Sequence, residues 1–410
     1  MASNMVSLFS LANWKNGLAF KQINFSEKGK PVIKIAELKN GITAQTARTQ
    51  QEFDSDVHLT KGDMVFSWSG NPETSIDVFW YDLPDGWLNQ HIFKVTPNNG
   101  VDKLYLYYLL KFLKPQFTAI ASNKQTTGLG HVTVKDMKEM MVPLPEMAVQ
   151  QAIGAYLHAI DQKAYVNNKI NDNLQQQART LFFEWFIKTP QDCATHETEL
   201  GTLPADYSVI KTGELPMIVT DYVANGSFAS LKENVQLYQE RNYAYFIRNT
   251  DLKAGTFEVF VDEHSYNFLT KSRLFGGEII ISNVGDVGSV YLCPKLDAPM
   301  TLGNNIIMLK PAQEELRYYM YIWFKWSLGQ GLLQGIKGGS AQPKFNKTDF
   351  KSLPVILPPQ DILHKFHETV RPMFEAIEVS QAENRRLAAL RDTILPKLMS
   401  GEIDVSDIQL

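Results

Sequence analysis

One long segment of this chain occurs twice. The segment from Pro143 to Lys188 recurs 213 residues later, from Ile356 to Gly401, and the two copies align without a gap. The large apolar residues of both copies coincide and step by three and four positions, the spacing of one face of an α-helix. At about 1.5 Å per residue, roughly 40 residues form a helix of about 60 Å. The repeat therefore predicts two long helices.

The apolar residues of the two helices predict that they pair with each other, because such a helix cannot bury its apolar stripe alone. We call this predicted contact the seam. It is formed by Ile153, Leu157, Ile160, Leu174, Leu181, Phe366, Val370, Met373, Leu387 and Ile394.

The middle of each seam is polar, because Asn167 and Asn171 align with Ser380 and Asn384. A buried polar layer fixes the register of paired helices at a cost in stability. The alternative is that these side chains face water near a break in the packing. Pro372 predicts a kink, or the end of an initial turn, in the second helix.

Length and composition restrict the class of protein. A chain of 410 residues with 44% hydrophobic residues predicts two or three domains with sizeable cores. No apolar run has the length of a membrane span and the first residues lack the pattern of a signal peptide, so we expect a cytoplasmic protein without membrane contact. The two cysteines, Cys193 and Cys293, form no metal or disulfide pattern.

The net charge of −4 argues against a simply basic nucleic-acid-binding protein. The acidic excess lies in the two helical segments, and the remaining parts of the chain are close to neutral. Any contact with DNA would therefore need a local cluster of cations, or a partner that supplies more positive charge.

Residues 1–142 have the pattern of a mixed domain with short strands, expected at residues 31–38, 63–70 and 91–98. The aromatic run from Asp102 to Lys114 predicts a helix, and residues 121–136 predict a polar loop.

The second half repeats this plan after a predicted linker, residues 191–206. Residues 277–294 resemble 62–80, residues 304–311 resemble 91–97, and the aromatic run 317–326 resembles 104–113. The loop 335–349 corresponds to the first polar loop. We predict a first domain at 1–143, a first long helix at 144–190, a linker and second domain at 191–357, and a second long helix with a tail at 358–410.

This ordered tandem resembles the DNA specificity subunits of type I restriction-modification systems over essentially all of its length. The most specific parts are the entry into the first long helix (LPEMAVQQ), its exit (LFFEWFI), and the segment LRDTILPKLMSGEI from Leu390 to Ile403.

The resemblance implies an α+β fold, with two mixed α/β target recognition domains separated by two long helices that form an intramolecular antiparallel coiled coil. Each domain would read one half of an asymmetric bipartite sequence in double-stranded DNA, and the helices would set the spacer between the halves. Family members bind two modification subunits, and the larger complex recruits restriction (translocase) subunits. The resemblance thus implies no catalysis and no cofactor in this chain, with S-adenosylmethionine, ATP and Mg²⁺ on the partner subunits.

The residues agree with a non-catalytic chain. There is no [DNS]-P-P-[YF] motif of an adenine methyltransferase, and the glycines after Trp326 do not form a phosphate-binding loop. No HExxH or comparable metal motif occurs, and the eight histidines are scattered.

Two polar loops at matching places are the first candidates for DNA contact. Base edges in the major groove are read by side chains that donate, accept or do both. The candidates in these loops are Lys124, Gln125, Thr126, Thr127, Lys337, Ser340, Gln342 and Lys344. The alternative is a plain surface loop in each half.

A second set of candidates follows a strand in each half: Ser67, Ser69 and Asn71, then Ser282 and Asn283. These residues could equally form tight turns. Arg248 and Arg273 are weaker candidates for phosphate contact, since surface cations are common.

The end of the first long helix carries Phe182, Phe183, Trp185 and Phe186, more aromatic surface than one seam can bury. We expect these residues to bind a partner subunit or to pack on the adjoining domain. For the whole chain, two alternatives remain: a coiled-coil scaffold that holds two protein-binding domains without DNA specificity, and an enzyme with an unrecognised site.

Overall fold

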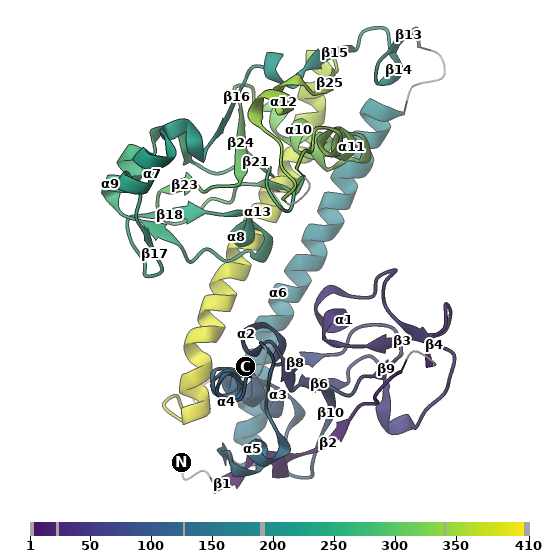
Figure 1. The fold of residues 1–410 in the computed structure, drawn as a ribbon, viewed down its shortest axis with the longest axis vertical. Coiled ribbons are helices and arrows are strands. Elements are labelled where there is room, and N and C mark those ends of the chain that lie inside the picture. The colour runs from purple at the N-terminus through teal and green to yellow at the C-terminus, as the bar shows by residue number, and fades with distance from the viewer. Residues whose placement is uncertain (1–3, 22–23, 126–127, 189–192, 340–341, 406–410) are drawn as a thin grey trace. The chain divides into compact units, whose positions relative to one another are not determined.

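The computed structural model describes residues 4–21, 24–125, 128–188, 193–339 and 342–405. They form two compact units. The first unit contains residues 1–164 together with 386–410, and the second contains residues 165–385. The division runs through both long helices, so each unit consists of one globular part and one half of each helix. Figure 1 labels the elements of both units.

The first unit is built on a four-stranded antiparallel sheet in the order β2-β10-β6-β8. Its strands are β2 (Ala12–Asn16), β10 (Ile92–Pro97), β6 (Met64–Ser67) and β8 (Asp77–Trp80). All four residues of β6 are buried because helices cover one face of this sheet and a second sheet the other. The strand predicted at 91–98 is present as β10, and the one predicted at 63–70 is present in part, as β6, which ends at Ser67.

The second sheet of the first unit has the order β4-β3-β9-β5 and contains one parallel pair, β3 with β9. Its strands are β3 (Lys30–Ile33), β4 (Arg48–Thr49), β5 (His58–Leu59) and β9 (Gly86–Leu88). The strand expected at 31–38 ends early, because residues Ile35–Asn40 form helix α1. The side chain of Glu37 accepts from the backbone N–H of Lys34, which closes the start of that helix.

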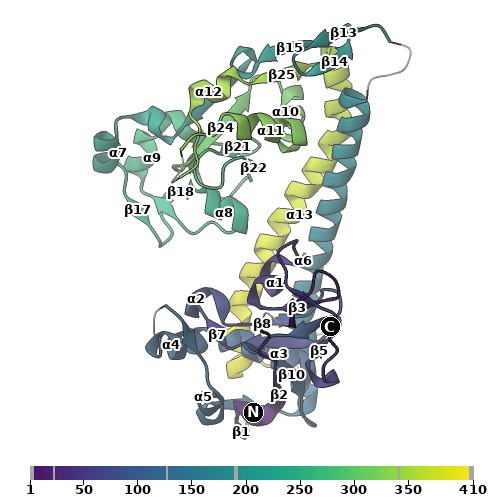
Figure 2. The same ribbon diagram turned by 45° about the vertical axis from the view of Figure 1, so that its right-hand side comes forward.

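The second unit repeats the first sheet strand for strand, in the order β16-β24-β21-β22. Its strands are β16 (Met217–Asp221), β24 (Ile306–Pro311), β21 (Ile279–Ser282) and β22 (Val290–Leu292). Figure 2 shows α10 (Glu315–Lys325) and α11 (Ser327–Gly335) on the side of this sheet that faces α13.

The second sheet of this unit has the order β17-β19-β18-β23-β20 and again contains one parallel pair, β18 with β23. Its strands are β17 (Leu237–Tyr238), β18 (Ala244–Ile247), β19 (Phe260–Val261), β20 (Arg273–Leu274) and β23 (Met300–Leu302). The order of the first sheet recurs strand for strand, and that of the second recurs with one additional edge strand, β17, which agrees with the duplication inferred from the sequence.

Short paired strands precede the long helices in both units. In the first unit, β1 (Asn4–Ser7) pairs with β12 (Met141–Leu144), and in the second, β15 (Ser208–Lys211) pairs with β25 (Pro354–Leu357). The predicted linker 191–206 is wrong in part, because it contains the hairpin of β13 (Thr195–Thr198) and β14 (Gly201–Pro204).

The aromatic runs form helices as predicted, α3 (Lys103–Phe112) and α10. The polar segments after them are shorter as loops than expected, because α4 (Lys114–Asn123), α5 (Val134–Glu139) and α12 (Lys347–Ser352) extend into them. Each of α5 and α12 begins at a side-chain cap, Thr133 and Asn346 respectively. The remaining α-helices are α2 (Pro72–Ser75), α7 (Phe228–Asn234), α8 (Asn249–Ala254) and α9 (Glu263–Phe268).

The two repeated segments form the long helices α6 (Met147–Phe182) and α13 (Gln360–Ser400). Helix α13 continues through Pro372, so the expectation that an initial turn ends there is wrong. Helix α6 passes into a π-helical turn, Phe183–Ile187. Within the described residues, no helix is long and apolar enough to span a membrane.

The halves of α6 and α13 pack together inside each unit. In the first unit, Ile153 and Leu157 share a core with Leu398 and Met399. In the second unit, the ring of Phe366 lies 4.8 Å from that of Phe186, measured between centroids. Both pairings join an earlier part of one helix to a later part of the other, so the helices are antiparallel within each unit. All the predicted seam residues are buried or half-buried.

The polar layer is buried in the second unit. The side chain of Asn167 donates to Asn384 Oδ1 at 2.8 Å and to Glu383 Oε2 at 2.7 Å, and Asn384 Nδ2 donates to Asn168 Oδ1 at 2.9 Å. Asn167 and Asn171 are only 3% and 4% exposed, which rules out the alternative that they face water. The amides of Asn167 and Asn384 are hydrogen-bonded to each other across the helices, so a shift of register would leave Asn167 buried without these partners. The side-chain oxygen of Asn171 is buried and has no hydrogen-bond partner among the described residues.

Candidate nucleic-acid interface

In the second unit, the candidate loop lies against the turn between β21 and β22. The backbones of Gly338 and Lys344 exchange hydrogen bonds of 2.9 Å, which closes the loop at its base. Gly285 N donates to Pro343 O at 2.9 Å, and Phe345 N donates to Asn283 O at 3.1 Å. The structure thus brings together two sets of candidates that are more than 50 residues apart in the sequence.

Helix α11 contacts the same turn through two side-chain hydrogen bonds. The side chain of Gln330 donates to the carbonyl of Gly288 at 2.8 Å, and that of Gln334 donates to the carbonyl of Val287 at 3.2 Å. Gly288 has a φ of +96°, a conformation that favours glycine. Because both glutamines use their amides for the turn, the turn is positioned by a helix of the core and keeps its polar tip in solvent.

The first unit has the same arrangement. The strand β11 (Gly130–His131), which follows the first candidate loop, pairs with β7 (Ser69–Gly70), which follows β6. Gly130 packs so closely on the end of α4 that a Cβ there would lie 2.2 Å from the carbonyl oxygen of Ala121. A glycine is therefore required where the loop returns to the domain.

The predicted loop residues that the structure describes are exposed: Lys124, Gln125, Lys337, Gln342 and Lys344. Thr126, Thr127 and Ser340 lie outside the described residues. Exposed amide and ammonium groups at a loop fixed on two sides are suited to contact base edges and phosphates.

Three of the second set of candidates are either buried or occupied by contacts within their own unit. Ser67 and Ser282 are fully buried at the ends of the equivalent strands β6 and β21, so neither side chain can reach DNA. The prediction that these two serines contact DNA is wrong, because the last residue of each strand points into the core. Asn71 is exposed, but its side chain accepts from the backbone N–H groups of Glu73 and Thr74 and caps α2. Ser69 and Asn283 are half-buried beside the loops and remain candidates.

The two arginine candidates are engaged within the second unit. The guanidinium of Arg248 forms an ion pair with Asp251 at 2.6 Å, and the Asp251 side chain also caps α8. Arg273 lies over the ring of Tyr266, 4.5 Å from its centroid. Both are half-buried, so a phosphate would have to compete with these contacts.

Lys124 also has an internal partner, the carboxylate of Asp136. Burial raises the pKa of Asp136, but the hydrogen bonds from Lys124 and Thr133 outweigh it and hold this pKa below its ordinary value. Lys337 instead donates to the neutral amide of Gln334 at 2.7 Å. The second loop therefore has more uncompensated positive charge than the first.

The aromatic end of α6 is divided between core and surface. Phe182 and Phe186 are 1% and 3% exposed and belong to the core of the second unit, so the expectation that they bind a partner is wrong for these two. They pack on α10 through Tyr319, which is the alternative given above. Phe183 is 47% exposed and Trp185 is half-buried, and both remain candidates for a partner contact.

One polar cluster was missed by the sequence reasoning. In the first unit, Asp161 of α6 accepts from Tyr108 at 2.7 Å and from Arg391 of α13 at 2.9 Å. Burial, together with Asp161, raises the pKa of Tyr108, so its hydroxyl stays protonated and donates. The sequence signal was the break in the repeat: the residues 213 positions away from Asp161 and Arg391 are the apolar Phe374 and Ala178.

The described residues contain no group of three or more His, Cys, Asp or Glu side chains that could hold a metal ion. Cys293 is buried, and its burial raises the pKa of the thiol.

Comparison with known proteins agrees with this architecture. The family model described as "Type I restriction modification DNA specificity domain" matches residues 3–176 and again residues 206–388. The chain is 27% identical to the type I restriction enzyme MjaIX specificity subunit of Methanocaldococcus jannaschii over 78% of this chain and 73% of that protein. It is 22% identical to the HindI specificity subunit of Haemophilus influenzae over 84% of this chain and 87% of that one.

A solved structure has a similar fold. The S subunit of a type I restriction-modification system from M. genitalium superposes with a TM-score of 0.55 at 17% identity and covers 97% of this chain and 96% of that one. The duplicated sheets, the two long helices and the two family-model matches agree with one another, and the matches together span most of the chain. The chain belongs to the type I restriction-modification DNA specificity family.

Proposed function

We propose that this chain is the DNA-reading subunit of a type I restriction-modification complex, in which each unit reads one half of an asymmetric bipartite target. The observation that carries the proposal is the repeated pairing of a polar loop with the turn that follows the third strand of the main sheet. Two similar but chemically different surfaces in one chain are suited to two different half-sites.

The long helices would set the distance between the half-sites and dock two modification subunits. A buried amide layer that fixes their register supports a role in which helix length matters. Catalysis would belong to the partners, with S-adenosylmethionine on the modification subunits and ATP and Mg²⁺ on restriction subunits.

Loop variants test the DNA contacts. Lys337→Ala, in the complex with modification subunits, should weaken binding to all duplexes and reduce the slope of log affinity against log salt by about 1, because one phosphate contact is lost. Gln342→Ala and Gln125→Ala should each relax sequence preference at one half-site only. Lys124→Ala should have a smaller effect than Lys337→Ala, because Asp136 already neutralises Lys124.

Lys232→Ala serves as the matched control, since Lys232 is exposed on α7, away from both loops in the sequence. If the four loop variants keep the affinity, the salt dependence and the sequence preference of the unmodified chain, the loops do not read DNA. A complex that enriches no sequence at all would instead favour the scaffold.

A further inference from the structure

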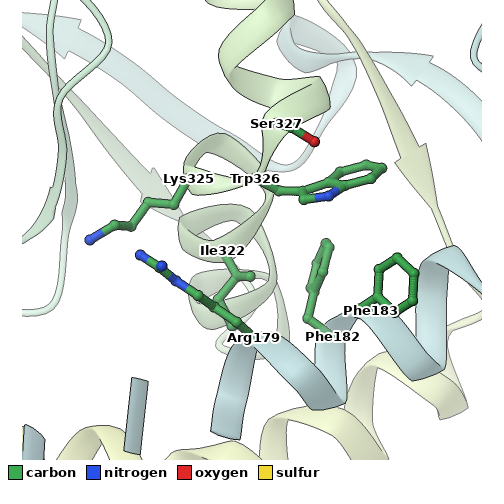
Figure 3. Close-up of a pocket in the computed structure, with 7 residues that line it drawn as sticks. All are labelled: Arg179, Phe182, Phe183, Ile322, Lys325, Trp326 and Ser327. Carbon is green, nitrogen blue, oxygen red and sulfur yellow. The ribbon is translucent and has the colours of Figure 1, made fainter. Parts of the chain in front are cut away.

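A hollow of about 150 Å³ opens in the second unit beside the end of α6. Its lining comes from α6 (Arg179, Phe182, Phe183) and from the junction of α10 and α11 (Ile322, Lys325, Trp326, Ser327). Figure 3 shows the charged ends of Arg179 and Lys325 directed to the same side, with the rings of Trp326, Phe182 and Phe183 on the other. The hollow therefore has a cationic side and an aromatic side.

The two cations are not neutralised within the described part of the chain. Lys325 Nζ donates to the hydroxyl of Tyr321 at 3.0 Å, which supplies no negative charge. No carboxylate of the described residues lies within ion-pair distance of Arg179 or Lys325. Two cations held side by side repel each other, and an anion placed between them removes this cost.

The equivalent place in the first unit has a different charge. In each unit, a tyrosine hydroxyl of the domain helix donates to a carbonyl just before the long helix: Tyr105 to Pro143, and Tyr319 to Ile356. Lys325 lies six residues after Tyr319, and Lys111 lies six residues after Tyr105, so the two lysines occupy equivalent positions. Lys111 is neutralised by Asp77 at 2.9 Å.

The position of Arg179 also differs. By the 213-residue repeat, Arg179 corresponds to Asp392 in the first unit, where Asp392 accepts from Arg391 at 2.9 Å. A surface that is doubly cationic in one unit is therefore compensated or acidic in the other. A partner that binds both units in the same way cannot make this contact twice.

We propose that this hollow docks an acidic and apolar segment of one of the two modification subunits, and that this contact is made only at the second unit. A carboxylate of the segment lies between Arg179 and Lys325, and a bulky apolar side chain covers Phe183 and Trp326. This inference rests on the proposed function, because it assigns a docking point to a partner named there.

A protein segment fits better than a DNA phosphate. Phe183 is 47% exposed at the rim, and a phosphate contact would leave that ring in water. Exposed aromatic surface beside arginine is typical of protein interfaces. The π-helical turn that carries Phe183 is a type of irregularity often found at functional sites.

The test uses the full chain and its cognate modification subunit. The double charge reversal Arg179→Glu with Lys325→Glu should weaken the binding of one of the two modification subunits by about tenfold or more at low salt. At high salt the loss of affinity should be smaller, because ions screen the charges. Native mass spectrometry should then show the complex change from two modification subunits per chain to one. Phe183→Ser should weaken the same subunit with little salt dependence.

The control reverses two other exposed lysines of the second unit, Lys211→Glu with Lys232→Glu, which gives the same change in net charge. It should leave two modification subunits bound. Circular dichroism and thermal unfolding should be unchanged in Phe183→Ser and in the single variant Arg179→Glu, since both residues are exposed. Lys325 is half-buried and donates to Tyr321, so the binding of the double variant is compared with that of Arg179→Glu alone, which should weaken the same subunit in the same direction.

Two results would overturn the inference while the proposed function stands. One is that the charge-reversed chain still binds two modification subunits with unchanged affinity. The other is that stoichiometry is unchanged but the salt slope of DNA binding falls by about 2, which would make the hollow a phosphate site. If the unmodified chain binds no modification subunit, the proposed docking function fails together with this inference.

Discussion

The Tyr108–Asp161–Arg391 cluster should contribute measurably to how the first domain is attached to its helices. Its side chains come from α3, α6 and α13, and Asp161 accepts one hydrogen bond from each of the other two. Replacing Arg391 by Met removes the cationic donor and keeps most of the aliphatic stem. The carboxylate of Asp161 then keeps only the Tyr108 hydroxyl as a partner within this cluster.

The expected cost follows from the burial of the pair. A hydrogen bond to a charged group contributes about 1.5–3 kcal/mol to stability when it is well shielded. The side chains of Arg391 and Asp161 are 34% and 29% exposed, so screening by water places the cost of Arg391→Met near the lower end, about 1–2 kcal/mol. Asp161→Asn should cost about the same, and the double variant should cost less than the sum.

Hydrogen exchange measured by mass spectrometry can locate this effect. A loss of about 1.4 kcal/mol in local stability corresponds to about tenfold faster exchange. Peptides from α3 and from residues 147–164 of α6 should show it, while peptides from β21 and β24 of the second unit provide an internal control. Additive single effects, or equal acceleration in both units, would refute the assigned role of the cluster.

Other parts of the fold give further predictions. Phe366→Ala should destabilise the second unit by about 3–5 kcal/mol in urea unfolding, because Phe366 is fully buried among Phe182 and Phe186; Phe366→Leu should cost much less, and equal costs would argue against this packing. Burial lowers the pKa of His367 below its ordinary 6.5 despite nearby glutamates, so the folded chain binds this proton less readily than the unfolded chain. The free energy of unfolding is therefore highest above pH 6.5 and decreases as the pH falls below it. The urea midpoint should therefore drop less between pH 7.5 and 5 in His367→Phe than in the unmodified chain, and an equal drop would contradict this. Insertion of one heptad into each of α6 and α13, near Asn167 and Asn384, lengthens both helices by about 10 Å. The spacer between the half-sites should then grow by about three base pairs. An unchanged spacer would show that the helices do not set its length.

The repeat made most of the architecture predictable. Apolar residues at helical spacing predicted both long helices. The alignment of Asn167 and Asn171 with Ser380 and Asn384 marked the polar layer, because both signals are local or periodic in the sequence. The strand predicted at 31–38 ends early because the carboxylate of Glu37 accepts a hydrogen bond from the backbone N–H of Lys34 and so caps a helix after Ile33, which apolar alternation cannot show. The hairpin in the predicted linker was missed because its strands are short and mostly exposed.

The candidate interface was predictable only in part. Loop composition identified Lys337 and Gln342, which the structure leaves exposed. Composition could not show that Ser67 and Ser282 point inward, because the direction of a side chain at a strand end depends on register. Nor could it show that Arg248 and Lys124 are paired with nearby carboxylates, since ion pairs depend on the fold of the segment. The cationic hollow joins residues about 150 positions apart, and no local pattern marks such a site.

Selection from random DNA duplexes tests the central claim most directly, with the intact chain and its modification subunits. If each unit reads one half-site, the enriched duplexes should share two short, unrelated blocks at one fixed spacing. The same selection with Gln342→Ala should relax one block and leave the other and the spacing unchanged. A single contiguous block, or a variant that alters both blocks together, would contradict the account.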